Sequence, residues 1–157
     1  MKVKDVMSSD VLFVRPHWTV FDCAKAFEKN NISGAPVIEN GKVVGIVSIS
    51  DLIKFMGIKL VDADILAEEP QGLSMLLLNL VKLGKDYIDF KKELERIAKF
   101  TVKDVMSKYV VHISPHANLY EAAKMMEDND VNRLPVIHNG KLIGIIARAD
   151  LVRALLK

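Results

Sequence analysis

Hydrophobic residues follow the same order of patterns twice along the chain. A β-type run at 11–14 precedes apolar residues at helical spacing, and two β-rich runs joined by Asn40-Gly41 come next. The same order returns 99 residues later. Asn-Gly between two such runs predicts a type I′ hairpin, because both central residues of that turn need positive φ. The pattern therefore predicts a β-α-β-β-α unit that is present twice.

Direct alignment of the chain with itself confirms the repeat. The stretch "VKDVMS" stands at 3–8 and again at 102–107, and 23 of 50 residues from 3 to 52 match at this offset without a gap. A unit of ~50 residues rarely buries an adequate core alone. We therefore expect a mixed α/β (α+β) fold, in which two pseudo-twofold-related repeats pack through their sheets and an α-helical segment lies between them.

Each predicted first helix has a capping signal. Thr19 with Asp22, and Asn118 with Glu121, have the spacing of a capping box. In this motif the two side chains bond each other's backbone N–H groups at the helix start. The signal predicts that the helices begin directly after Thr19 and Asn118.

Composition excludes several classes of protein. The 22 basic and 20 acidic residues give a net charge of +2, which argues against nucleic-acid binding. The single Cys23 favours a reducing compartment. The longest apolar stretch is interrupted by polar residues, and the N-terminus lacks the apolar core of a signal peptide. The expectation is a cytoplasmic protein without membrane insertion.

Catalytic and metal-binding patterns are not evident in the sequence. The four histidines lack metal-ligand spacing, and no Ser-His-Asp set or phosphate-binding glycine loop is present. Cys23 lies on the apolar face of its predicted helix and is interpreted as a core residue. We expect neither a metal site nor enzymatic activity.

Four marks occur in order in both copies, and together they resemble the CBS domain. They are the "VKDVM" opening, an apolar-x-x-x-Pro-Val step, the Asn-Gly hairpin, and a Gly-x-x-Ser/Thr-x-x-Asp ending at 45–51. The second ending, at 144–150, has Ala147 at the hydroxyl position. Tandem CBS domains form a pair called a Bateman module.

The resemblance implies a domain organisation and a function. It implies one CBS-pair module over 1–157, with repeats at 1–58 and 101–157 and a helical insertion at 59–100. Such pairs bind adenine nucleotides (AMP, ADP, ATP), or S-adenosylmethionine and methylthioadenosine, in clefts between the repeats. They require no cofactor and regulate a partner protein, which the sequence does not identify.

Both clefts are expected to combine residues of the two copies. By resemblance, the first is lined by Ser48, Asp51, Ser33, Gly34, Met106, Val110 and Val131. The second is lined by Asp150, Arg148, Ala147, Arg133, Asn132, Met7, Val11 and Ile32.

Asp51 and Asp150 are the central candidates. A carboxylate at the start of a helix can accept two hydrogen bonds from a ribose diol, and helix N–H groups favour phosphate. The alternative is that each Asp simply caps its helix.

The copies differ in charge near these residues. Ser48 is expected to donate a hydrogen bond to phosphate, whereas Ala147 removes that hydroxyl. Arg133 and Arg148 stand in the second copy instead, and guanidinium groups suit a phosphate. The alternative for both arginines is solvated surface charge.

An apolar stripe runs from Leu73 to Ile97 at spacings of three and four residues. It predicts a helix over 73–99, or two helices if Gly84 breaks it. The stripe favours contact with a second chain, and hence a homodimer. The alternatives are packing on its own CBS pair or binding of a regulated partner.

Two further function classes stay open. One is a structural oligomerisation module whose clefts are vestigial. The other is an enzyme subunit, although too little chain lies outside the repeats for a catalytic barrel.

Overall fold

The computed structural model describes residues 1–55, 92 and 95–156. The chain divides into two compact units. Unit 1 comprises Met1–Leu12, Asn40–Val43 and Tyr109–Lys157, and unit 2 comprises Phe13–Glu39 and Val44–Lys108. The first "VKDVMS" therefore belongs to the unit built around the second copy, and the second "VKDVMS" belongs to the unit built around the first.

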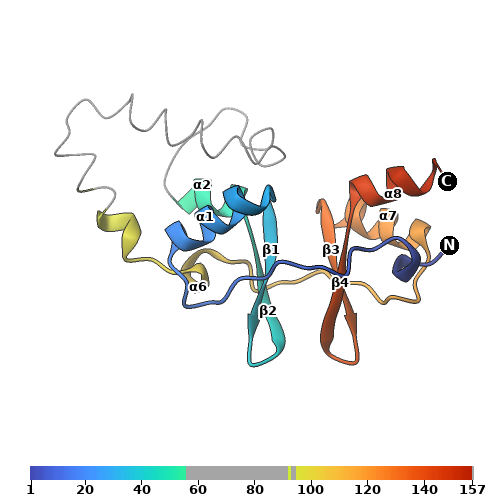
Figure 1. Ribbon diagram of the computed structural model, residues 1–157, viewed down its shortest axis with the longest axis horizontal. Coiled ribbons are helices and arrows are strands. Elements are labelled where there is room, and N and C mark those ends of the chain that lie inside the picture. Colours follow the sequence, from blue (N-terminus) through green and yellow to red (C-terminus); the bar gives the residue numbers. More distant parts are fainter. Residues whose placement is uncertain (56–91, 93–94, 157) are drawn as a thin grey trace. The chain divides into compact units, whose positions relative to one another are not determined.

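Both copies have the same order of elements (Figure 1). The first copy contains a 3-10 helix η1 (Val3–Asp5), α1 (Val20–Asn30), β1 (Gly34–Glu39), β2 (Lys42–Ser48) and α2 (Ile49–Phe55). The second contains α6 (Val102–Val105), α7 (Leu119–Asp128), β3 (Arg133–His138), β4 (Lys141–Ala147) and α8 (Arg148–Ala154). This mixture of helices and strands confirms the predicted fold class.

The two hairpins, β1–β2 and β3–β4, form as predicted. Asn40 and Gly41 have φ values of 51° and 76°, and Asn139 and Gly140 have 50° and 76°. Positive φ at both central residues is the signature of the type I′ turn.

The capping signals are also confirmed. Thr19 Oγ1 accepts a hydrogen bond from the Asp22 N–H at 3.0 Å, and the Asp22 carboxylate accepts one from the Thr19 N–H. Asn118 and Glu121 exchange the same pair of bonds at 2.8 and 2.9 Å. Two N–H groups at each helix start are thus satisfied locally.

The predicted first strand of each copy is wrong in extent. In place of a four-residue strand, each run makes one parallel bridge, Val14 with Val37 and Ile113 with Val136. The rest of each run is irregular.

Prolines explain why the pairing stops at one bridge. Val14 donates to the carbonyl of Pro36 and accepts from the N–H of Ile38. In a parallel ladder the next donors on either side would be residues 16 and 36. Both are proline and have no N–H. The second copy carries proline at both matching positions.

Each unit has its own hydrophobic core. The core of unit 2 joins the buried faces of α1 and α2 to β1, β2 and α6, and the core of unit 1 joins α7, β3 and β4 to η1. Phe27, Leu52 and Ile53 are fully buried in unit 2, as are Leu134 and Ile146 in unit 1.

Most of the apolar stripe, and with it the prediction of one or two helices, lies outside the described residues. Its last member, Ile97, is described. It is 2% exposed and belongs to the core cluster of unit 2. For this residue, packing on the chain's own fold is the correct alternative.

Candidate functional site

In unit 2, Ser48 ends β2 and Asp51 lies in the first turn of α2. One carboxylate oxygen, Asp51 Oδ2, accepts from the Ser48 N–H at 2.8 Å and from the Ser48 hydroxyl at 2.9 Å. The Ser48 hydroxyl proton is therefore directed at Asp51 and not outward. The other oxygen, Oδ1, has no hydrogen-bond partner among the described residues.

Ser33 and Gly34 lie beside this turn. The Ser33 carbonyl accepts a hydrogen bond from the Ile49 N–H at 2.9 Å, and Ser33 is 8% exposed. A Cβ on Gly34 would lie 3.5 Å from the Ser48 Cβ and 3.1 Å from the Val47 carbonyl. Three of the predicted residues, Ser33, Gly34 and Ser48, are thus brought together.

Met106 reaches the same strand from the second "VKDVMS". Ser107 exchanges two backbone hydrogen bonds with Ile46, both at 2.9 Å. A Cβ on Gly45 would lie 2.6 Å from Met106 Sδ and 2.8 Å from the Ser107 carbonyl. Any larger residue at position 45 would collide with these atoms. Gly45 of the ending motif therefore allows Met106 of the opening motif to pack directly against the strand.

Cys23 lies close to Asp51 and is fully buried. Burial, and then the negative charge of Asp51, raise the pKa of the Cys23 thiol from 9.0 to about 12. The thiol stays protonated at neutral pH, and the interpretation of Cys23 as a core residue is confirmed.

Unit 1 holds the counterpart site with a different hydrogen-bond arrangement. Asp150 Oδ2 accepts from the Ala147 N–H at 2.7 Å, which matches the bond between Ser48 and Asp51. Asp150 Oδ1 accepts from the guanidinium of Arg153, one turn further along α8. The Asp150 side chain is 11% exposed and that of Arg153 is 72% exposed.

Asn132, Arg133 and Arg148 gather next to Asp150. The Asn132 carbonyl accepts from the Arg148 N–H at 3.0 Å, and Arg133 pairs with Ala147 across the β3–β4 hairpin. Arg133 is half-buried, and burial lowers the pKa of its guanidinium. Arg148 is exposed, which agrees with the surface-charge alternative.

Met7 repeats the arrangement of Met106. Ser8 exchanges two backbone hydrogen bonds with Ile145, both at 2.9 Å. A Cβ on Gly144 would lie 2.5 Å from Met7 Sδ and 2.9 Å from the Ser8 carbonyl. The six-residue repeat therefore docks on the glycine-containing strand of the other copy in both units.

Four apolar residues predicted to line the two sites are divided between the two units. Val11 lies in unit 1, with the Asp150 site to which it was assigned. Val110 and Val131 lie in unit 1 and Ile32 in unit 2, so each belongs to the unit opposite its predicted site. Their assignment to these sites stays a prediction.

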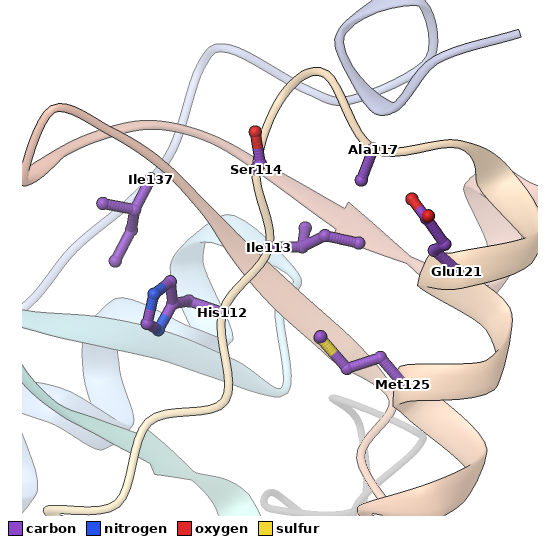
Figure 2. A pocket seen from close by; sticks show the side chains of 7 residues that line it. All are labelled: His112, Ile113, Ser114, Ala117, Glu121, Met125 and Ile137. Atoms are coloured by element: carbon purple, nitrogen blue, oxygen red, sulfur yellow. The ribbon is translucent and has the colours of Figure 1, made fainter.

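Figure 2 shows a pocket of about 370 Å³ in unit 1 that sequence reasoning missed. Glu121 and Met125 of α7 line one side, and His112 and Ile137 lie across from them. None of the predicted site residues lines it. It comes from the packing of a helix against an irregular segment, for which the local sequence carries no signal.

Two of the four histidines lie close together in the structure. His116 and His138 stand with ring centroids 5.5 Å apart. Across residues 1–55, 92 and 95–156, no three His, Cys, Asp or Glu side chains are grouped to hold a metal ion. In the same part of the chain, no helix has the length and hydropathy to span a membrane.

Comparison with known proteins bears on both copies. The family model described as "CBS domain" matches residues 3–58 and 102–157. The uncharacterised protein MJ1426 of Methanocaldococcus jannaschii is 36% identical over 158 residues, which cover 99% of this chain and 92% of that protein.

Two solved structures of CBS pairs with ligands are similar in fold. The structure of CBSX2 from Arabidopsis thaliana in complex with AMP has a TM-score of 0.67 at 27% identity, covering 99% of this chain and 96% of that one. The CBS pair of protein MJ0100, in complex with 5-methylthioadenosine and S-adenosyl-L-methionine, has a TM-score of 0.68. It covers 99% of both chains at 20% identity, which supports the fold alone.

Proposed function

The chain belongs to the CBS-domain family, and on that premise we propose that it is a regulatory module that senses adenosine-containing ligands. One site is centred on Asp51 and the other on Asp150. Occupancy of these sites is transmitted to a partner protein. Candidate ligands are AMP, ADP, ATP, S-adenosylmethionine and methylthioadenosine.

The observation that carries the proposal is the matched environment of the two aspartates. In each unit an Asp in the first turn of a helix has one oxygen bonded to the N–H three residues earlier. The methionine of the "VKDVMS" segment rests on the same strand, at the glycine six residues before the Asp. A short backbone turn and an apolar side chain are thus held near a carboxylate that can accept bonds from a ribose diol.

The charge difference suggests different ligand preferences. Arg133 and Arg148 lie at the strand-to-helix turn that carries Asp150, whereas Gly34 and Ile49 stand at the matching positions near Asp51. A phosphate gains from guanidinium groups. We therefore assign phosphorylated ligands to the Asp150 site, and neutral or cationic adenosyl groups to the Asp51 site.

The proposal also covers the domain organisation, oligomeric state and location of the protein. We propose a non-enzymatic CBS pair over 1–157, with repeats at 1–58 and 101–157, that forms a homodimer in the cytoplasm. The buried, protonated Cys23 is compatible with a reducing compartment.

A thermal-shift screen with the five candidate ligands tests the function. At a hundredfold excess over Kd, a ligand that binds the native state alone adds about 2.7 kcal/mol to the free energy of unfolding. We expect at least one ligand to raise Tm. The absence of any shift at millimolar concentration would overturn the sensor proposal.

One observation favours the second candidate, a structural module with vestigial sites. Both aspartates already bond the backbone at their helix starts, which is the capping role considered for them. If this is their whole function, Asp51→Ala and Asp150→Ala lower stability without changing the response to any ligand.

A further inference from the structure

Arg153 distinguishes the two aspartate sites more directly than the arginines that the sequence singled out. It lies three residues after Asp150 on α8, and its guanidinium donates to Asp150 Oδ1. The matching residue in the first copy is Lys54, which is exposed and forms no ion pair with Asp51. Asp51 Oδ1 is left without a hydrogen-bond partner among the described residues.

Both oxygens of Asp150 are therefore engaged. Oδ2 caps the helix through the Ala147 N–H, and Oδ1 faces Arg153. A ribose diol has two hydroxyl donors, and one carboxylate oxygen can accept both when its two acceptor positions are open. No described residue occupies either position of Asp51 Oδ1. At Asp150 the ribose competes with a charged donor.

We propose that Arg153 is a specificity-determining residue that ranks the two sites by competing with the ribose for Asp150. This inference rests on the proposed adenosine-binding function. A neutral nucleoside then fills the Asp51 site first, because at Asp150 the ribose competes with Arg153 for Oδ1. Ligands that also carry a phosphate offset this loss through the neighbouring Arg148.

The expected effect is modest because Arg153 is 72% exposed. Exposed ion pairs are typically worth 0.2–1 kcal/mol, and 1.4 kcal/mol corresponds to a tenfold change in affinity. Loss of the pair should therefore tighten nucleoside binding at Asp150 by roughly 1.4- to fivefold. Salt screens exposed ion pairs, so raising the salt concentration should tighten binding as well, and only when Arg153 is present.

The experiment isolates each site by removing the other aspartate. Calorimetric titration with adenosine is carried out on Asp51→Ala and on Asp51→Ala with Arg153→Gln, at low and high salt. The matched control is Asp150→Ala with and without Lys54→Gln. We expect Arg153→Gln to tighten binding by roughly 1.4- to fivefold and to abolish the gain with salt, and we expect Lys54→Gln to change little.

The outcomes separate this inference from the proposed function. Unchanged or weaker adenosine binding in the Arg153→Gln protein, while the Asp51 site still binds, overturns the role of Arg153 alone. An equal gain from Lys54→Gln also overturns it, because the effect would then be one of general charge. If the wild-type protein binds no adenosine or AMP, the proposed function falls and the inference falls with it.

Discussion

Two helices at matching positions of the repeat have opposite surroundings. In α2, Ile49, Leu52 and Ile53 are fully buried, whereas α8 has no buried residue. Val152, which matches Ile53, is 59% exposed. The two helices share the Asp-Leu pair at their centre, yet one has a covered face and the other an open one.

The residues before the second "VKDVMS" contribute to this difference. Phe100 contacts Phe55 at the end of α2 with ring centroids 4.5 Å apart, and Ile97 joins the same core. The residue that matches Phe100 in the first copy is Met1, which is 63% exposed. The repeat therefore sets the local elements, while residues that differ between the copies, such as Ile49 against Arg148 and Phe100 against Met1, set how deeply each helix is buried.

The largest expected contrast is in the stability lost when a side chain on the inner face of each helix is shortened. Ile53→Ala should lower the free energy of unfolding by about 2–5 kcal/mol, through lost burial and a cavity. Val152→Ala should change it by less than about 0.5 kcal/mol. Urea denaturation measures both. Equal losses would show that α8 is as well covered in solution as α2.

The docking of the "VKDVMS" segments should be equally sensitive in both units. Gly45→Ala and Gly144→Ala each place a methyl group against a methionine sulfur and a backbone carbonyl. Because the carbonyls of Ser107 and Ser8 are held by ladder hydrogen bonds, we expect each substitution to cost about 1–3 kcal/mol.

Chemical denaturation checks this prediction, with Lys42→Ala and Lys141→Ala as controls. Both lysines are exposed at the start of the same two strands. A glycine substitution no more costly than its lysine control would mean that the segment is not seated there in solution.

Cys23 makes the stability of unit 2 depend on pH in a way that has no counterpart in unit 1, because Ala122 occupies the matching position there. Its pKa is raised from 9.0 to about 12 in the folded state, so above pH 9 the unfolded chain loses this proton while the folded chain keeps it. Stability from this group is complete below pH 9 and falls as pH rises toward 12. The loss is about 1.4 kcal/mol at pH 10.

Denaturation of wild type and Cys23→Ala between pH 8 and 10.5 isolates this contribution. The variant should lose stability less steeply with pH. Parallel curves for the two proteins would contradict the raised pKa.

The smallest expected contrast concerns the caps of α2 and α8. Ser48→Ala removes the hydroxyl that bonds Asp51 and should cost about 1 kcal/mol. Ala147→Ser adds that hydroxyl beside Asp150 and should stabilise unit 1 by a similar or smaller amount. Thermal unfolding of both variants measures these changes in stability. A Ser48→Ala protein that is more stable than wild type would contradict the stabilising role of this hydroxyl.

Features fixed by neighbouring residues were predictable from the sequence. The hairpins follow from Asn-Gly turns, and the helix starts follow from capping boxes, because each interaction spans a few residues. The first strands were overestimated because β propensity was considered without their partners. Pro16 and Pro36 lack the donors that a longer ladder needs, and this becomes visible only when the two segments are paired.

The proximity of some candidate site residues was predictable. Ser33, Gly34 and Ser48 are neighbours in the structure, as are Asn132 and Arg148, while their role in ligand binding stays a prediction. The ion pair from Arg153 to Asp150 was missed, although the spacing of three residues on a helix permits it. Asp51 and Lys54 have the same spacing but form no ion pair. The spacing alone therefore does not predict which of the two aspartates is paired.

Calorimetric titration of adenosine into wild type, Asp51→Ala, Asp150→Ala and the double variant tests the central claim of two unequal adenosyl sites most directly. The account predicts that Asp51→Ala weakens adenosine binding more than Asp150→Ala does, and that the double variant loses at least about tenfold in affinity, since hydrogen bonds to a carboxylate are worth about 1.5–3 kcal/mol. A double variant that binds adenosine as tightly as wild type would contradict it.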